Sequence, residues 1–167
     1  KNYNIKTNRL SMNKTIKIVH APTSRRKKGT KFIIRSIDEL IEMGYPIELI
    51  LVENIPANDV QRIFGSCDFG IDQVISGWYG KVSIELMLAG KPVFCNVEDG
   101  FRHGISEIPI VNVNPNNLTN KLKYFLDHPA ELNNLVMKGI DYVKSQHDVS
   151  AVIKNLIYYY RRSFRTG

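Results

Sequence analysis

The stretch that decides the fold of this chain is GWYGKVSIELMLAGKPV, which occupies residues 77–93. It follows an apolar segment at 69–74 and runs in the order loop, helix, turn and strand. The helix is expected at 81–89, because Gly90 lies at a typical C-terminal cap position and a proline follows shortly after it. With a strand expected at 92–96, the stretch forms a strand–loop–helix–strand unit typical of a parallel sheet.

Glu85 lies about one turn inside the helix that follows this loop. Gly77 and Gly80 make the loop permissive, so its backbone can approach another group closely. In open parallel sheets, ligands bind outside the carboxyl ends of the strands, which places Glu85 beside such a region. A carboxylate near a helix start is also favoured by the helix dipole alone, and the spacing supports both interpretations equally.

Strands and helices alternate along the rest of the chain. Strands are expected at 15–20, 47–52, 69–74, 92–96 and 108–113, and helices at 30–43, 58–64, 81–89, 118–126, 132–143 and 149–160. The continuous apolar run at 47–52 is typical of a strand that is buried on both faces. We therefore predict an α/β fold, a doubly wound parallel sheet of about five or six strands with helices on both faces. Val52, Ile71 and Val93 are expected in its core.

The composition is that of an ordinary globular domain, with 43% hydrophobic and 23% charged residues among 167. No run is apolar and long enough to cross a bilayer, and no signal peptide is visible. Cys67 and Cys95 lie in or beside apolar segments without metal-type spacing, which favours small core residues of a reduced, cytosolic protein. The net charge of +7 favours an anionic partner, whether a nucleotide phosphate, a nucleic acid or an acidic membrane surface.

One domain is expected at 15–167, with a polar linker or lead-in at 1–14 before it. Because the sequence begins with Lys1 rather than Met, we expect it to be a fragment of a longer chain. Tyrosines and arginines gather in the segment 158–165. This segment is either a contact with a membrane surface or a partner domain, or a solvated helix end whose cations the dipole favours, and the second interpretation is preferred.

A basic loop, RRKKG at 25–29, follows the first expected strand and opens the first helix. Backbone N–H groups at a helix start, together with arginine and lysine side chains, form a site for anions. A solvated run of charges is the alternative interpretation. The glycine pattern of a dinucleotide-binding loop is absent, and so is the Walker pattern.

None of the four histidines has a neighbour at metal-ligand spacing, so no metal site is expected. His20 ends the first strand and either lines the binding region or has a hydrogen-bonded structural role. No Ser–His–Asp or Cys–His arrangement follows from the spacing, so the catalytic residues stay unassigned.

The segment YGKVSIELMLAGKPV, residues 79–93, resembles the nucleotide-sugar-binding segment of GT-B glycosyltransferases, in particular the large family of retaining, nucleotide-sugar-dependent enzymes. The resemblance extends over roughly 15–160 and is to the C-terminal, donor-binding half of these two-domain enzymes. It implies a Rossmann-like fold, and it implies that Glu85 accepts hydrogen bonds from the ribose hydroxyls of the donor. Gly77 is a departure, because the family usually has a second glutamate there that touches the donor sugar.

The resemblance also implies the other donor-binding residues. Arg25 and Lys28 match the residues that grip the donor diphosphate, and Gly29 allows its close approach. The backbone of Ile55 matches the position that meets the nucleobase, with an ordinary turn residue as an equal alternative. The loop supplies the remaining candidates, Gly77, Trp78, Tyr79 and Gly80, and its two aromatic rings either form a wall of the sugar site or pack beneath the loop.

The implied function is to bind a nucleoside-diphosphate sugar for transfer to a saccharide or lipid-linked acceptor, in polysaccharide or glycolipid assembly. Acceptor binding is assigned to an N-terminal domain missing from this chain, so the chain alone is expected to be inactive. No cofactor, metal or nucleic acid is expected. The expected location is the cytoplasm, with peripheral contact at the inner face of the membrane as a further option. Two alternatives stay open: a GT-B nucleotide-sugar epimerase, and a non-enzymatic module that binds nucleic acid or has a regulatory role.

Overall fold

The computed structural model describes residues 14–101, 107–148 and 153. Apart from residues 14 and 153, the lead-in expected at 1–14 and the helix expected at 149–160 lie outside these ranges, as does the segment 158–165. The strands are β1 (Ile16–His20), β2 (Ile47–Leu51), β3 (Phe69–Ile71), β4 (Val93–Cys95) and β5 (Val111–Asn112). The helices are α1 (Arg25–Lys28), α2 (Thr30–Glu42), α3 (Ala57–Ser66), α4 (Lys81–Leu88), α5 (Leu118–Asp127) and α6 (Pro129–Gln146), with a short 3-10 helix η1 (Asp99–Phe101).

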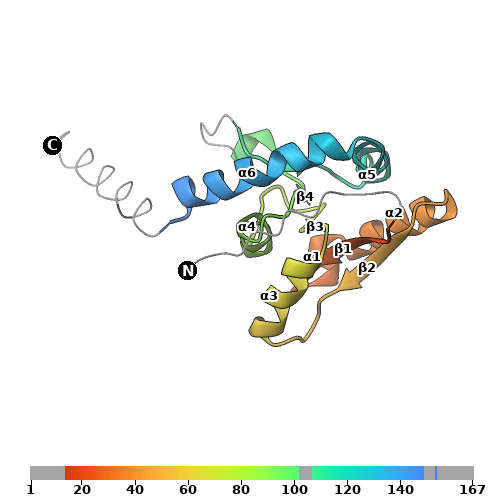
Figure 1. Cartoon of the computed structure of the whole chain (residues 1–167), viewed down its shortest axis with the longest axis horizontal. Coiled ribbons are helices and arrows are strands. Elements are labelled where there is room, and N and C mark those ends of the chain that lie inside the picture. The colour runs from red at the N-terminus through yellow and green to blue at the C-terminus, as the bar shows by residue number, and fades with distance from the viewer. Residues whose placement is uncertain (1–13, 102–106, 149–152, 154–167) are drawn as a thin grey trace.

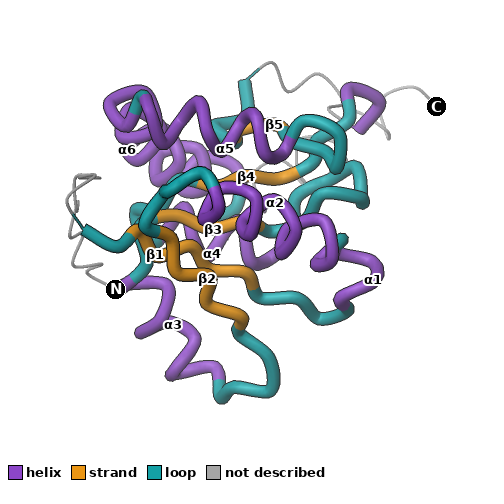
Figure 2. Tube along the Cα trace, turned by 90° about the vertical axis from the view of Figure 1, so that its right-hand side faces the viewer, coloured by secondary structure: helices purple, strands orange, loops and turns teal. Residues whose placement is uncertain are grey.

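The described strands form one five-stranded sheet in the order β2-β1-β3-β4-β5, and every pairing is parallel. Ile18 of β1 lies between Leu49 of β2 and Phe69 of β3 in the register. Figure 2 shows the strands side by side, with helices before and behind them. The predicted doubly wound parallel sheet is confirmed.

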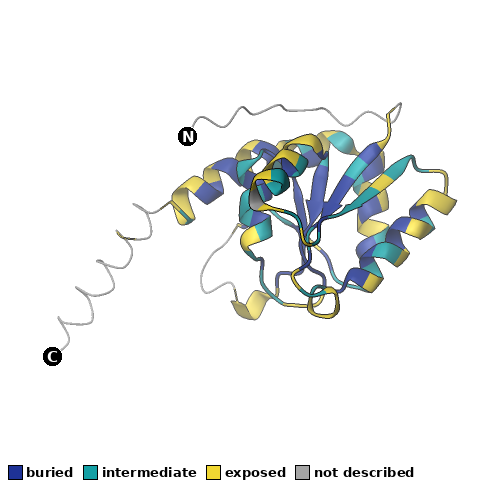
Figure 3. Ribbon diagram, turned by 90° about the horizontal axis from the view of Figure 1, so that it is seen from below, coloured by how far each residue is buried: buried dark blue, intermediate teal, exposed yellow. Residues whose placement is uncertain are grey.

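Helices cover both faces of the sheet (Figure 1). On one face α2 and α5 pack against Ile18, Phe69 and Phe94 through their own apolar side chains. On the other face α3, α4 and α6 pack against Val19, Val93 and the other strand residues whose side chains point to that face. Figure 3 shows the inner strands as a buried layer between helices whose outward sides are exposed. This arrangement follows from the alternation of side chains along a strand, which gives each face its own core.

The three residues expected in the core are all buried: Val52 is 6% exposed, and Ile71 and Val93 are 0% exposed. Cys67 and Cys95 are also buried in the core as free thiols. Burial raises the pKa of each thiol to about 12. Both cysteines therefore pack as small hydrophobic residues, as their sequence context predicts.

The prediction for the second strand is wrong in one respect, because β2 is only half-buried. Among the described strands, β2 lies at an edge of the sheet, next to β1. Glu48 on this strand is exposed and forms an ion pair with Lys17 of β1 at 3.8 Å. An apolar run alone does not distinguish an edge strand with one half-covered face from a central strand.

The third strand is shorter than the segment predicted at 69–74, and it ends at Ile71. Backbone hydrogen bonding to the neighbouring strand β4 continues past this end, because Asp72 N–H donates to the Phe94 carbonyl at 3.0 Å. Gly70 lies within this strand, and a Cβ placed there would be 2.3 Å from Leu86 Cδ1 of α4. The missing side chain lets α4 pack closely on β3, which brings the start of α4 to the end of that strand.

Candidate functional site

The carboxyl ends of β1 and β3 mark the topological switch point of this sheet, where the chain leaves one strand toward one edge and the next strand toward the other edge. From β1 the chain crosses to β2 at one edge, whereas β3 leads on to β4 and β5 at the other. Ligands of open parallel sheets bind at such a switch point, outside the carboxyl ends of the strands. The helix α1 follows β1 here, and the loop that opens α4 follows β3.

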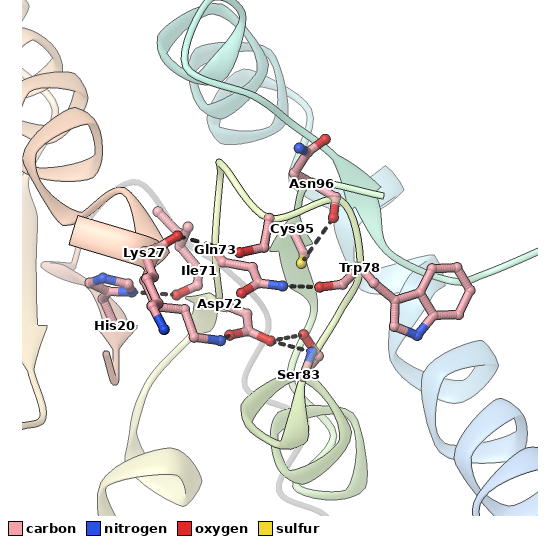
Figure 4. A network of polar contacts seen from close by, with 12 residues as sticks. His20, Lys27, Ile71, Asp72, Gln73, Trp78, Ser83, Cys95 and Asn96 are labelled. Carbon is pink, nitrogen blue, oxygen red and sulfur yellow. Dashed lines mark hydrogen bonds and ion pairs between the residues drawn. The ribbon is translucent and has the colours of Figure 1, made fainter. Parts of the chain in front are cut away.

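Asp72 joins these two segments through its side chain (Figure 4). Its carboxylate is completely buried, and Oδ1 lies 2.5 Å from Lys28 Nζ. The other oxygen, Oδ2, accepts hydrogen bonds from Gly80 N–H at 2.8 Å and from Ser83 Oγ–H at 2.7 Å. A buried charge is stable in a fold only when it is paired and hydrogen-bonded, and this one is.

Sequence reasoning missed Asp72 because it was counted within an apolar strand. The available signal was the charge itself, since a carboxylate at the end of an apolar run must find a partner if the fold buries it. Its partners lie on elements that are distant in the sequence, and Lys28 is 44 positions away. The sequence does not show which cation that partner is.

Gly29 connects α1 to α2 at a position where no other residue fits. Its φ of +77° is in the left-handed region, and a Cβ there would lie 2.5 Å from Cγ2 of Val74. The backbone N–H of Val74 also donates to the Lys28 carbonyl at 3.1 Å. The close approach predicted for Gly29 is therefore made to the chain after β3, and the contact with a phosphate stays a prediction.

The basic segment forms a short helix, α1, where the sequence suggested a loop. Arg25 donates to Glu53 from Nε to Oε1 at 2.9 Å, and this contact holds the pKa of the Glu53 carboxyl below its usual range. Arg26 and Lys27 are exposed, and Lys28 points inward to the buried carboxylate of the loop after β3. The structure thus separates Arg25 and Lys28, the two predicted phosphate contacts, from their two neighbours.

Glu85 lies on α4 with a half-buried side chain. Its Oε1 is 3.3 Å from Lys81 Nζ one helical turn earlier, and 30% of the side chain is exposed. Gly80, whose N–H is held by Asp72, is the residue immediately before this helix. The Glu85 carboxylate therefore lies near the start of α4, beside the contacts that Asp72 makes with Lys28, Gly80 and Ser83, which we call the switch-point network. Its contact with ribose stays a prediction.

The two loop aromatics occupy different environments. Tyr79 is 7% exposed, and its hydroxyl forms hydrogen bonds of 2.9 Å with Tyr142 Oη and His147 Nε2. Burial raises the pKa of the Tyr79 phenol. Trp78 stacks on Tyr79 with ring centroids 4.7 Å apart, and its carbonyl accepts a hydrogen bond from Gln73 Nε2. Tyr79 therefore packs beneath the loop against α6, and in Figure 4 the Trp78 ring points away from Asp72.

Ile55 lies in the loop before α3, is half-buried and packs on the core of the α4 face. The residue before it, Asn54, has a left-handed φ of 55°. This turn carries the chain from β2 to α3, and it follows Glu53, the partner of Arg25. A contact between the Ile55 backbone and a nucleobase stays a prediction.

Of the two interpretations of His20, the structure supports the hydrogen-bonded structural role. It is completely buried, with Nδ1 at 2.8 Å from the Ile71 carbonyl and Nε2 at 2.8 Å from Thr30 Oγ1. Burial lowers the pKa of this imidazole. The ring thereby ties the end of β1 to the end of β3 and to the start of α2.

Two further observations concern the described residues alone. No three His, Cys, Asp or Glu side chains among them come together as a metal ion would require. None of their helices is long and apolar enough to span a membrane.

Comparison with solved structures finds several similar folds, whereas no protein-family model and no curated protein matches the chain. HepE from Anabaena, solved with UDP and with UDP-glucose, is similar over 89% of this chain, with TM-scores of 0.64 and 0.60 at 12% and 13% identity. WaaG, a glycosyltransferase involved in lipopolysaccharide biosynthesis, is similar over 84% at a TM-score of 0.57 and 16% identity. A protein described as a UDP-N-acetylglucosamine 2-epimerase, from Listeria monocytogenes, is similar over 73% at a TM-score of 0.52 and 16% identity.

The chain spans about half the length, or less, of the structures that it matches: 49% of HepE, 46% of WaaG and 39% of the Listeria protein. At these identities the likeness concerns the fold. It confirms the fold expected from the sequence, which is that of one half of a GT-B glycosyltransferase.

Proposed function

We propose that this chain binds a nucleoside-diphosphate sugar at the carboxyl ends of β1 and β3, as the donor half of a GT-B glycosyltransferase. The observation that supports it is the switch-point network, in which buried Asp72 joins the basic helix α1 to the start of α4. The fold likeness adds support, because HepE has been solved with UDP and with UDP-glucose. We propose that the sugar is transferred to a saccharide or lipid-linked acceptor, which another domain binds.

The roles follow from the chemistry of each group. Lys28 has three ammonium hydrogens and directs one contact to Asp72, so two donors remain for a phosphate. Arg25 is exposed over 57% of its side chain and presents a permanent positive charge beside it. Glu85 accepts the ribose hydroxyls, because an ionised carboxylate is an acceptor for two donors at once. In this proposal the two cations donate charge-assisted hydrogen bonds to the diphosphate, and no metal or cofactor takes part.

The epimerase alternative has a fold that the comparison also supports, through the Listeria protein. An epimerase changes the sugar without an acceptor, so product analysis with and without acceptor, on a protein that contains both halves, separates it from a transferase. The binding-module alternative rests on the net charge of +7. It predicts oligonucleotide binding that falls steeply with salt, and saturable binding of a nucleoside diphosphate contradicts it.

Glu85 provides the first test. Calorimetric titration with UDP, GDP and ADP identifies the nucleotide that binds, and Glu85→Ala should weaken it by about 1.5–3 kcal/mol, the value of a hydrogen bond to a charged group. Glu39→Ala is the control, because Glu39 also faces a basic residue one turn earlier, with 35% of its side chain exposed, and it accepts a hydrogen bond from Thr119 of α5. Equal affinities of wild type and Glu85→Ala, both folded, would leave Glu85 with a helix-dipole role alone.

The predicted phosphate contact is tested by titrating variants of Arg25 and its neighbours with the nucleoside diphosphate and with the nucleoside. Arg25→Ala should weaken the nucleoside diphosphate much more than the nucleoside, since only the diphosphate presents the anion. Arg26→Ala and Lys27→Ala are the controls, because both side chains are exposed, whereas Lys28 is the residue of this segment that pairs with Asp72. A similar loss in all three variants would indicate a diffuse positive field instead of a defined phosphate site.

A further inference from the structure

Glu98 lies directly over Gly77, the loop residue at which the sequence departs from its resemblance. A Cβ placed on Gly77 would be 2.7 Å from Cδ of Glu98 and 2.9 Å from its Oε2. Glu98 comes after β4, and Gly77 comes after β3, so the contact joins the carboxyl ends of two neighbouring strands. The φ of Gly77 is outside the left-handed region, so glycine here provides space and no unusual torsion. The space that its missing side chain leaves is filled by the Glu98 carboxylate.

The backbone around Glu98 is held in place on both sides. Its own N–H donates to the Gly77 carbonyl at 2.9 Å. The preceding residue, Val97, donates from N–H to Asn112 Oδ1 at 2.9 Å and accepts from Asn112 Nδ2 at 2.8 Å. After it, Phe101 N–H donates to the Glu98 carbonyl at 3.1 Å and closes η1. The side chain therefore projects from a preorganised backbone, as a binding residue requires.

The carboxylate itself is available to a ligand. Glu98 is exposed, and no hydrogen bond or ion pair joins its side-chain oxygens to another residue of the described parts of the chain. Three other carboxylates near the carboxyl ends, those of Glu53, Asp72 and Glu85, each face a basic side chain. Among these four, Glu98 is thus the carboxylate that faces no basic side chain in the described parts of the chain.

An aromatic ring lies beside this carboxylate. Phe101 Cε2 is 2.9 Å from the same Cβ position on Gly77, and Phe101 is 49% exposed. A sugar ring has hydroxyl groups that donate to a carboxylate and C–H faces that pack on an aromatic side chain. An acceptor and an exposed aromatic ring over a bare glycine backbone form a surface of that chemistry.

The position of this surface suits the sugar of a nucleotide sugar. The loop from Gly77 to Gly80 connects it to the Gly80 N–H that Asp72 holds, next to Lys28. In a nucleoside-diphosphate sugar, the sugar is attached to the diphosphate. A diphosphate at Lys28 and the start of α4 would lie at one end of this loop, and the surface at Glu98 and Phe101 lies at its other end.

We infer that Glu98 binds the hydroxyl groups of the donor sugar, with Phe101 packing against the sugar ring, and that Gly77 is glycine because a side chain would displace the carboxylate. This inference rests on the proposed donor-binding function. It makes Glu98 a residue that determines which sugar is accepted, and it assigns no proton transfer to it.

The test compares one nucleotide with and without its sugar. Wild type is titrated with UDP, GDP and ADP and with UDP-glucose, GDP-mannose and ADP-glucose, and the best-bound pair is then used for the variants. Glu98→Ala should weaken the nucleotide sugar about ten-fold or more, as expected for a lost hydrogen bond to a charged group. Its affinity for the nucleoside diphosphate should stay within about two-fold of wild type, within measurement scatter.

Gly77→Ala is the second variant, and it leaves Glu98 in the chain. The added methyl group meets the ends of two flexible side chains, so the fold should tolerate it while the carboxylate moves. We expect the same selective loss of the nucleotide sugar, and the double variant Gly77→Ala/Glu98→Ala should lose no more than Glu98→Ala alone. Gly100→Ala is the matched control, because a Cβ on Gly100 has no atom within 4 Å.

The outcomes separate this inference from the proposed function. If wild type binds none of the six probes, the proposed function is wrong and the inference falls with it. If wild type binds them but Glu98→Ala weakens nucleotide and nucleotide sugar equally, or neither, the donor site stands and the role of Glu98 is refuted. A loss in Gly100→Ala as large as in Gly77→Ala would also refute the steric explanation for Gly77.

Discussion

At the scale of single residues, the Asp72 carboxylate organises the candidate site. It is completely buried, and it joins Lys28 of α1 to the Gly80 backbone and Ser83 at the start of α4. Taking a charge out of water is unfavourable, and the compensation here comes from one cation and two hydrogen bonds. The pair therefore sets the relative positions of α1 and α4 more than it adds stability in excess of an apolar pair.

Removing Asp72 should destabilise the fold strongly. Asp72→Ala leaves the Lys28 side chain, which is 14% exposed, without its partner, so the free energy of unfolding should fall by about 3–5 kcal/mol in urea titration. Asp72→Ala/Lys28→Met should lose less than Asp72→Ala alone, because it also removes the unpaired charge. Glu48→Ala breaks an exposed ion pair and should change stability by about 1 kcal/mol or less. Strictly additive losses in the double variant would contradict the buried-pair interpretation.

At the scale of elements, the turn between α1 and α2 has the most restricted geometry of the site. Gly29 ends α1 and precedes α2, with its backbone in the left-handed region and its Cα against Val74. The turn therefore brings Lys28 back toward the end of β3. A residue with a side chain at this point would disturb both the torsion and the packing.

Three glycines separate these two effects. Gly29→Ala combines an unfavourable φ with a clash at 2.5 Å, and it should reduce the unfolding free energy by about 2–4 kcal/mol. Gly44→Ala has a φ of +93° but open space, so its loss should be about 1–2 kcal/mol, from the torsion alone. Gly65→Ala lies in α3 with neither constraint and should stabilise by about 0.5–1 kcal/mol. Denaturant unfolding measures all three, and an equal loss in Gly29→Ala and Gly44→Ala would show that the contact with Val74 is unimportant.

At the scale of the whole molecule, this chain spans about half the length of the solved structures that it matches. It covers 49% of HepE and 46% of WaaG. Glycosyl transfer requires an acceptor hydroxyl held next to the reacting carbon of the sugar, and much of the acceleration comes from that positioning. In our proposal, the present half binds the donor, and acceptor positioning comes from a second half.

These 167 residues should therefore bind the donor without transferring its sugar. A nucleoside diphosphate at 100 times its dissociation constant should stabilise the fold by about 2.7 kcal/mol in a thermal-shift assay. Added saccharide or lipid-linked acceptors should cause no release of nucleoside diphosphate from its sugar. Acceptor-dependent release by this chain at a rate typical of enzymes would show that the half-molecule proposal is wrong.

The sequence by itself determined the order and type of the elements. The apolar segments, helix periodicities and glycine stops predict a parallel α/β fold, and the stretch at 77–93 predicts α4 and β4 within one or two residues. It also indicated Arg25, Lys28 and Glu85 as residues near the carboxyl ends of the strands. The predictions of the fold and its elements succeed because each depends on neighbours along the chain, where spacing and capping act directly.

Only the tertiary structure decided which side chains meet. The partner of Lys28 is Asp72, the carboxylate over Gly77 comes from Glu98 after the next strand, and β2 is an edge strand instead of a buried one. None of these follows from local pattern, because the order of strands in a sheet is set by how the crossover helices pack on its two faces. The physical reason is that a buried charge or an empty glycine surface is matched by residues that are close in space and far apart in the chain.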